Sequence, residues 1–569
     1  MIKEFRMFFL TVIVLCMSGC TGFESLDDST STLQSSFTCN QNTSSLRDTP
    51  SRFLSKLQLR NSVEDLFGSS LINSTAVQAA FGSLSDESNN DITFQRQSTI
   101  DSTKITAYFN IARAISEEVI SSSALRATVF GTCQSDVDVT RACADSFISN
   151  YAVKILRRPL KTDEINTIYE IVDGGDTKNE KLRAMLFSLV GSPFFVWNVE
   201  LGENNSSNTS FSLNSYEVAS KLSYKITDSA PDASLLNAAL DGSIKNESTI
   251  KAQAQRLLQT QRGKDKVIRS ILRWSGANFI KDISSLPTSM VNGINTNNLE
   301  NAMIDEAYKF VEHIVFEQKG SFKDLLLSKA SFASHDGLAD VYNHTPYVEG
   351  QNPQSFPDER MGLLLRAPFL THYSSRSSII NRGVQFQLKI LCNKIPEPNV
   401  DISADRDADS RTQEESLFHS NRSNIKEMTK IPVCMSCHNV INPTGFALES
   451  FDSLGRYRAQ ESIYSLEGDY ERDVSVDTRT DLPITFEETV QIDNASDLVR
   501  FVAESNNGNE CFVRNINRFF NEKEVESSDH CRLESAFQNL ANLDAPILSV
   551  IEGIVLDENL KAKSIGASQ

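Results

Sequence analysis

Two cysteines and a histidine lie within five residues in the last quarter of the chain, in the run Cys434-Met435-Ser436-Cys437-His438. This C-x-x-C-H spacing is typical of a site where a c-type haem is covalently attached. Two thiols on one helical turn can each form a thioether with a vinyl group of the porphyrin. The adjacent imidazole then faces the iron, a position that histidine commonly takes in haem proteins. We therefore expect haem c bound through Cys434 and Cys437, with His438 as the axial ligand of the haem iron.

Three other uses of the same residues remain open. The two cysteines could form a redox disulfide, as in C-x-x-C oxidoreductases. They could instead bind zinc together with His438 and a fourth ligand, or form a structural disulfide of an exported protein. No second C-x-x-C and no H-x-x-x-H occurs in the sequence, and no βαβ pattern surrounds the motif. Haem is accordingly the expected cofactor, with zinc as the alternative.

The N-terminus predicts export and a lipid anchor. Lys3 and Arg6 precede a short apolar run over residues 7–15, which is too short to span a bilayer and is typical of a signal peptide. Residues 17–20 (MSGC) resemble a bacterial lipobox, so Cys20 is the expected site of lipid attachment. Because Thr21 rather than Asp follows the anchor, the resemblance favours an outer-membrane lipoprotein, facing the periplasm or the cell surface. Plain secretion with cleavage elsewhere is the alternative.

Charge argues against nucleic acid as a partner. The chain has 569 residues, with 55 basic and 74 acidic side chains and a net charge of −19. Binding to nucleic acid rewards clustered Lys and Arg, and no long basic run exists here. The expected partners are the membrane, through the lipid anchor, and a redox partner protein.

Cysteine use agrees with an oxidising compartment. Of ten cysteines, Cys16 leaves with the signal peptide, Cys20 takes the lipid, and two belong to the haem motif. The remaining six form an even set, which an exported protein can oxidise to disulfides. Proximity in sequence favours two pairs, which leaves the third by elimination, although six cysteines allow 15 connectivities. The expected pairs are Cys133–Cys143, Cys511–Cys531 and Cys39–Cys392.

Hydrophobic periodicity predicts a mainly α, multi-module protein, because apolar residues recur at helical spacing along most of the chain. Asn214 and Glu217 are spaced as a capping box before one helix. A second helix, over residues 300–317, has a clear apolar face, and its acidic residues, Glu306 among them, are expected on a solvated face. Only residues 463–492 alternate as strands do, which predicts a small β-hairpin before the C-terminal helices. The expected segments are a signal peptide (1–20), a flexible tether (21–50), three helical modules (51–130, 131–205 with Cys133 and Cys143, and 206–345), the C-x-x-C-H module (346–462), and a C-terminal hairpin and helical module (463–569).

Several stretches, in this order, resemble a planctomycete-type family of large exported bacterial proteins that is described through domains of unknown function. Residues 57–68 (LQLRNSVEDLFG), 157–160 (RRPL) and 216–224 (YEVASKLSY) are similar to its motifs. Residues 434–458 match best, and are similar to C-x-x-C-H-x-x-I-D-P-x-G-F-A-L-E-N-F-D-x-x-G-x-x-R. The resemblance covers most of residues 50–560. It implies a multi-module, mainly helical, cytochrome-like protein, but no particular reaction.

The distal side of the haem is less constrained by the sequence. Where the family usually has His six residues before the first motif cysteine, this chain has Met428, and either type can bind haem iron. His372 and His419 are the other candidate distal ligands, and an ordinary packing or surface role is the alternative for all three. Residues 442–446 (NPTGF) are expected to wrap the haem edge. Asp452 and Arg456 could pair, or Arg456 could meet a haem propionate.

Three functions follow from these expectations. The first is electron transfer through one covalently attached haem in an envelope-anchored protein. The second is a haem enzyme in which the sixth coordination position stays open. The third is a binding or scaffold lipoprotein in which the motif holds zinc or forms a disulfide.

Overall fold

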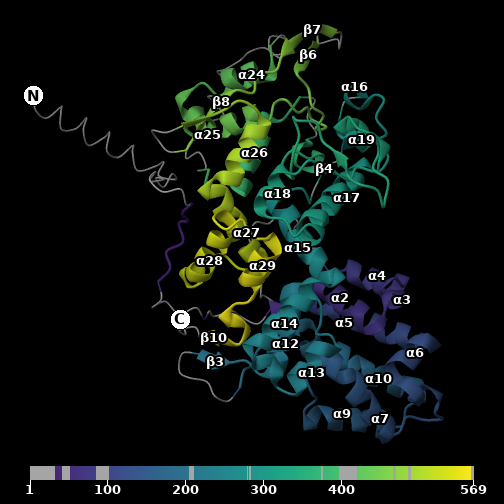
Figure 1. Ribbon diagram of the computed structural model, residues 1–569. Coiled ribbons are helices and arrows are strands. Elements are labelled where there is room, and N and C mark those ends of the chain that lie inside the picture. Colours follow the sequence, from purple (N-terminus) through teal and green to yellow (C-terminus); the bar gives the residue numbers. More distant parts are fainter. Residues whose placement is uncertain are drawn as a thin grey trace, which may run out of the picture. The chain divides into compact units, whose positions relative to one another are not determined.

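The computed structural model describes residues 33–40, 46, 52–84, 101–203, 210–278, 280, 283–286, 288–372, 376–395, 419–464, 470–484 and 489–564 (Figure 1). The predicted signal peptide, Cys20 and most of the predicted tether lie outside these residues. The chain divides into two compact units, which are described separately. The N-terminal unit comprises Phe37–Val267, Asn517–Leu533 and Ile551–Gln569. The motif unit comprises Met1–Ser36, Ile268–Ile516 and Glu534–Val550.

The N-terminal unit is helical, as the periodicity predicts. Its helices are α2 (Lys56–Phe67), α3 (Ser69–Ile72), α4 (Thr75–Gly82), α5 (Ser102–Ser121), α6 (Ser123–Phe130), α7 (Arg141–Phe147), α8 (Val153–Leu156), α9 (Thr162–Asp173), α10 (Lys178–Val190), α11 (Pro193–Val196), α12 (Ser215–Thr227), α13 (Ala233–Leu240) and α14 (Glu247–Leu258). Two short antiparallel pairs accompany them, β1 (Arg52–Phe53) with β2 (Trp197–Asn198), and β3 (Ser210–Ser212) with β10 (Ala562–Ser564).

Local signals explain where α12 begins. The Asn214 side chain accepts hydrogen bonds from the backbone N–H groups of Tyr216 and Glu217, and the Glu217 carboxylate accepts one from the Asn214 N–H. This reciprocal arrangement satisfies donors that a helix start otherwise leaves unpaired. The predicted capping box is therefore confirmed. The same carboxylate also accepts bonds from the N–H groups of Leu201 and Gly202, which fixes the preceding loop to the helix start.

Buried ion pairs attach the C-terminal residues of the N-terminal unit to α12. Lys225 pairs with Asp557 at 2.9 Å, and Glu200 lies between Lys221 and Lys563 at 3.2 and 2.8 Å. Burial lowers the pKa of the Lys225 ammonium to about 8. Charges taken out of water are tolerated only when they are paired, so these contacts fix the register of the segment.

The motif unit contains α16 (Thr288–Val291), α17 (Leu299–Glu312), α18 (Phe322–Leu327), α19 (Asp336–Tyr342), α20 (Ala367–Leu370), α21 (Ile379–Gln385), α24 (Asn421–Met428), α25 (Pro432–Ala447) and α26 (Ala495–Glu504). Four further helices, α15 (Gln261–Ser275), α27 (Asn506–Asn521), α28 (His530–Ala541) and α29 (Ile547–Val555), contribute residues to both units. The described strands of this unit pair in twos and antiparallel: β4 (Ala330–Ser331) with β5 (Gln354–Ser355), β6 (Gln460–Tyr464) with β7 (Tyr470–Ser475), and β8 (Thr480–Pro483) with β9 (Thr489–Ile492). Where one small hairpin was expected over residues 463–492, the structure has two.

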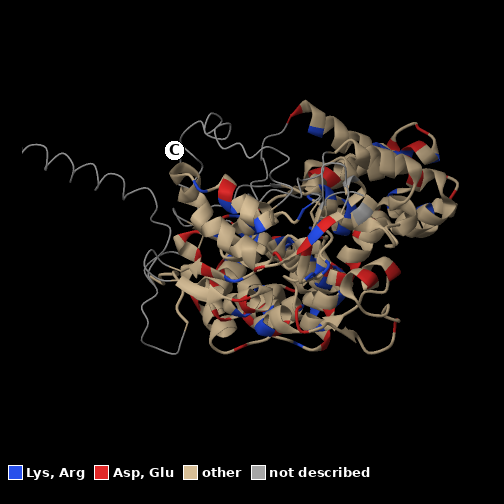
Figure 2. Cartoon of the chain, turned by 90° about the horizontal axis from the view of Figure 1, so that it is seen from above, with Lys and Arg blue, Asp and Glu red and all other residues tan. Residues whose placement is uncertain are grey.

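Helix α17 carries the predicted apolar face, since Met303, Ala307 and Phe310 are fully buried. The expectation for Glu306 was wrong, because this residue is 2% exposed rather than solvated. Its carboxylate forms an ion pair with the buried Arg366, whose guanidinium also stacks on the Phe310 ring. An arginine 60 residues away in sequence satisfies the buried charge, and a helical pattern read locally cannot reveal such a partner. Basic and acidic residues are otherwise interspersed along the helices (Figure 2).

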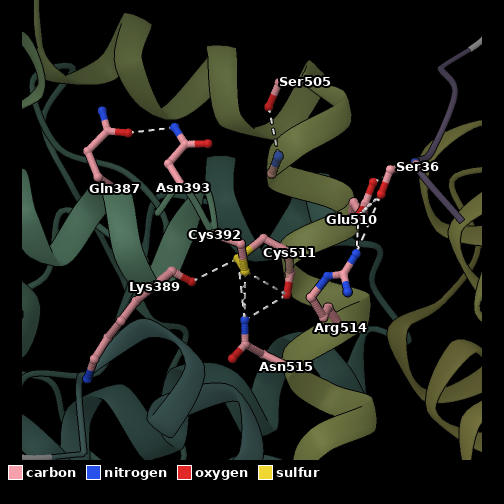
Figure 3. Close-up of a disulfide and its surroundings, with 11 residues drawn as sticks. Ser36, Gln387, Lys389, Cys392, Asn393, Ser505, Glu510, Cys511, Arg514 and Asn515 are labelled. Carbon is pink, nitrogen blue, oxygen red and sulfur yellow. Dashed lines mark hydrogen bonds and ion pairs between the residues drawn. A yellow bond between two sulfur atoms is a disulfide. The ribbon is translucent and has the colours of Figure 1, made fainter. Parts of the chain in front are cut away.

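Three disulfides correct two of the expected pairings. Cys133 pairs with Cys143 as expected, but Cys39 pairs with Cys531, and Cys392 with Cys511. Figure 3 shows the last bond, with Asn515 beside it; the Asn515 amide lies 3.2 Å from the Cys392 sulfur and donates to the Cys511 carbonyl at 2.9 Å. Cys511 and Cys531 are close in sequence, which favoured their pairing, but they belong to different units.

Candidate functional site

Helix α25 brings the three motif residues together. Pro432 occupies its first turn, where a missing N–H costs nothing, and starts the helix directly before the motif. Cys434 and Cys437 are one turn apart, and His438 is four residues beyond Cys434. All three side chains are half-buried, and both cysteines are thiols rather than a disulfide. Two thiols and one imidazole therefore lie within little more than one turn of a single helix.

The two halves of α25 differ in burial. Residues after His438, including Ile441, Phe446 and Ala447, are buried. The first half is partly open, with Met435 38% exposed. The N-terminal half of α25 is thus left partly uncovered, whereas its C-terminal half is anchored in the core.

That anchoring depends on close packing between α25 and α21. A Cβ at Gly445 would lie 2.2 Å from the Ile379 carbonyl oxygen, and a Cβ at Gly383 would lie 2.2 Å from that of Ile441. Residues 442–446 are therefore inside a helix that packs on another helix, and their contact with a haem edge stays a prediction. The absence of a side chain at Gly445 serves helix packing.

A chain of hydrogen bonds orients the His438 ring. The Thr429 hydroxyl donates to the Ile425 carbonyl at 2.7 Å, so its oxygen is left to accept from Asn442 Nδ2 at 2.9 Å. The Asn442 amide oxygen consequently faces His438 Nδ1 at 2.9 Å. An amide oxygen can only accept, so the proton of the neutral imidazole lies on Nδ1. Nε2 then keeps its lone pair, and among the described residues it has no hydrogen-bond partner.

The three candidate distal ligands are found in different settings. Met428 precedes Thr429 of this hydrogen-bond chain and is largely exposed. His372 is 8% exposed, and its backbone N–H donates to the Ser453 carbonyl at 2.8 Å. His419 is exposed, and its carbonyl accepts from Arg376 at 3.0 Å. These contacts do not identify any of the three residues as the distal ligand opposite His438.

The second half of the motif builds a rigid loop after α25. The Asp452 carboxylate accepts from the backbone N–H groups of Leu454 and Arg456 and pairs with the Arg456 guanidinium at 2.7 Å. Of the two alternatives for this pair, the ion pair is the one present. Gly455 turns the chain with a φ of 83°. Phe451 then pairs with Tyr457 as an isolated antiparallel bridge.

A buried carboxylate ties this loop to the helices. Glu449 is 2% exposed, and its oxygen accepts from Arg458 at 2.7 Å and from the Ser377 hydroxyl at 2.6 Å. Burial raises the pKa of the Glu449 carboxyl to about 6. Sequence analysis assigned no role to Glu449 or Thr429 and considered Asn442 only as part of residues 442–446. Glu449 and Asn442 belong to the motif pattern of residues 434–458, which was the available signal.

The described residues contain no group of three or more His, Cys, Asp or Glu side chains placed to hold a metal ion. Within the same residues, no helix is long and apolar enough to cross a membrane.

Comparison with known families supports the resemblance in part. Residues 213–343 match the family model PSD4, described as a protein of unknown function (DUF1592). Residues 360–461, which include the C-x-x-C-H motif, match PSCyt3, described as a protein of unknown function (DUF1588). Comparison with the curated proteins and with the solved structures found no match. The chain thus combines two domains of unknown function whose family names indicate cytochrome-like proteins.

Proposed function

We propose that α25 carries one covalently attached haem c and that the protein transfers electrons in the bacterial cell envelope. When bound, the haem would supply a one-electron redox centre. Cys434 and Cys437 would hold it by thioethers, and His438 would bind the iron through Nε2. The name of the family model over residues 360–461 is in keeping with this role.

The observation that carries the proposal is the hydrogen-bond chain through Asn442. A histidine that binds a metal through one nitrogen almost always donates the N–H of the other to an acceptor. Here Nδ1 has that acceptor at 2.9 Å, and the acceptor is itself held by Thr429. The nitrogen left with its lone pair is Nε2, so the imidazole is pre-oriented as a ligand before any metal binds.

The surroundings of the thiols support the same assignment. A porphyrin is a large apolar plate, and burying apolar surface favours binding. Met435, between the two cysteines in the motif, is 38% exposed and offers apolar surface on this part of the helix. Cysteines covered by other side chains would leave no room for a porphyrin, whereas the first turns of α25 remain accessible.

Spectroscopy separates electron transfer from the two alternatives. The full chain is to be exported from a host that attaches haem c, and its reduced spectrum recorded. A six-coordinate, low-spin spectrum supports electron transfer, while a high-spin spectrum supports an enzyme with an open position. A protein without haem that contains zinc supports a scaffold role and overturns the proposal.

Two variants sharpen this experiment. Cys437→Ser removes one thioether, so normal attachment through two thioethers is lost. The neighbouring Ser436→Ala is the matched control, because it leaves both thiols in place and removes an exposed hydroxyl that donates to the Val433 carbonyl. Haem attached by two thioethers in Cys437→Ser would contradict the proposal.

The envelope location rests on Cys20. Metabolic labelling with a fatty acid is expected to mark the wild-type protein and its Cys16→Ser variant, because Cys16 leaves with the signal peptide. Cys20→Ser is expected to lose the label and the membrane association. Labelling that persists in Cys20→Ser would contradict the lipid anchor.

A further inference from the structure

A cleft of about 380 Å³ lies within the motif unit, beside the loop that follows α25. Its walls come from residues 358–359, from 450 and 457–459, from 476 and 478, and from 494–496 and 500 at the start of α26. The volume falls in the range of about 300–1,000 Å³ that is usual for small-ligand sites. None of these residues belongs to the five-residue C-x-x-C-H run, although Ser450, Tyr457 and Arg458 lie within the longer pattern of residues 434–458.

One hydroxyl in the cleft lining belongs to Ser450. This residue is 8% exposed, and among the described residues its Oγ has no hydrogen-bond partner. The oxygen is not fully enclosed, so it reaches the cleft and is available to a ligand. The backbone holds this hydroxyl in place, because the Arg458 N–H donates to the Ser450 carbonyl at 2.7 Å.

The cleft also presents an aromatic ring. Tyr457 is 46% exposed, and its ring packs edge-on against Phe451 with centroids 5.9 Å apart. The bridge between the two residues fixes the ring relative to Ser450. A tyrosine held in this way offers a flat apolar face together with a polar tip, a combination suited to ligands that have both kinds of surface.

The charges in the cleft disfavour an anion. The lining contains Arg458, Arg500, Asp358 and Glu359. Arg458 pairs with Glu449 at 2.7 Å, and Arg500 pairs with Asp497 at 3.1 Å. Asp358 pairs with Lys329. Both arginines thus already have a carboxylate partner, and the Glu359 carboxylate adds hydrogen-bond acceptors rather than a site for an anion.

We propose that this cleft binds a neutral saccharide unit. Tyr457 would contact the apolar face of the sugar ring, and Ser450 would bond one of its hydroxyl groups. Glu359, on the exposed rim, supplies an acceptor for further hydroxyls. This inference is independent of haem attachment, because its residues lie outside the C-x-x-C-H motif.

The test uses the full exported protein and isothermal titration with maltose, cellobiose, lactose and diacetylchitobiose. At least one of these sugars is expected to bind. Tyr457→Ala is expected to weaken its affinity about tenfold or more, since an aromatic anchor is lost. Ser450→Ala is expected to weaken it severalfold, and Tyr457→Phe, which keeps the ring, to retain most of it.

The control is Tyr470→Ala, which removes another tyrosine that is 59% exposed, on β7. It should leave the affinity unchanged, and thermal unfolding should show that all four variants fold. The proposal is overturned if none of the four sugars binds, or if Tyr457→Ala binds as well as wild type. Displacement of the sugar by sulfate or acetate would also overturn it, because the site would then be one for anions.

Discussion

Gly383 and Gly445 face each other across two helices in a reciprocal arrangement. Gly445 of α25 lies against the carbonyl of Ile379 on α21, and Gly383 of α21 lies against the carbonyl of Ile441 on α25. Each glycine thereby lets the partner backbone approach closely. The pair holds the buried half of the helix whose other half carries Cys434 and His438.

Replacing Gly445 with alanine is expected to destabilise the motif unit. The added Cβ would lie 2.2 Å from a backbone oxygen, so the helices must separate, and overpacking of this kind typically costs about 1–3 kcal/mol. Denaturant unfolding measures the change. The control is Gly553→Ala in α29, where nothing lies within 4 Å of the new Cβ and alanine favours the helix. Equal stability of the two variants would contradict the close approach.

The hydrogen-bond chain predicts the tautomer of His438 before haem is attached. In protein produced without the attachment machinery, ¹⁵N NMR at a pH where the ring is neutral should place the proton on Nδ1. Asn442→Leu removes the acceptor and is expected to produce a mixture of tautomers. Thr429→Val should do so in part, because Asn442 keeps its place but loses the bond that orients its amide.

A second substitution at position 442 is expected to change the reduction potential of the haem protein. Asn442→Asp introduces a charged acceptor, which the related motif pattern has at this position. A carboxylate raises the basicity of the ligand histidine, so the reduction potential of the haem protein should fall. A potential that is the same in both proteins would show that Asn442 does not act on His438.

Glu449 makes stability depend on pH. Its folded pKa of about 6 is above the ordinary value of 4.5, so the folded protein binds this proton more tightly than the unfolded chain does. The contribution is fully present below about pH 4.5 and is lost as the pH rises through 6, a change of about 2 kcal/mol. Glu449→Gln should flatten the unfolding free energy over this range. Glu170→Gln, an exposed carboxylate of α9, should not change it.

The disulfide pattern gives a direct check on the two units. Peptide mapping without reduction is expected to recover Cys39–Cys531, Cys133–Cys143 and Cys392–Cys511. The double variant Cys392→Ser/Cys511→Ser should lose about 2–4 kcal/mol of stability, because the unfolded chain is no longer constrained. Recovery of a Cys511–Cys531 peptide would contradict this pattern and would support the pairing that sequence proximity favours.

These comparisons show which features local sequence can predict. The apolar face of α17 and the capping box of α12 depend on residues that are close in sequence. Both features could therefore be predicted from the sequence. The Cys39–Cys531 bond joins residues 492 apart, and the bond from Asn442 to Thr429 joins two helices. Spacing along the chain carries no information on such contacts. Gly445 illustrates the same limit, since the sequence does not show that its close neighbour is the Ile379 carbonyl.

The central claim is that a porphyrin is covalently attached beside His438. Its most direct test is the intact mass and visible absorbance of the full exported protein, purified from a host that attaches haem c and then denatured. The account predicts one haem retained through two thioethers, with Cys434→Ser and Cys437→Ser each reducing this to a single bond or none. A colourless protein whose mass shows no haem, from a host that matures another c-type cytochrome normally, would contradict it.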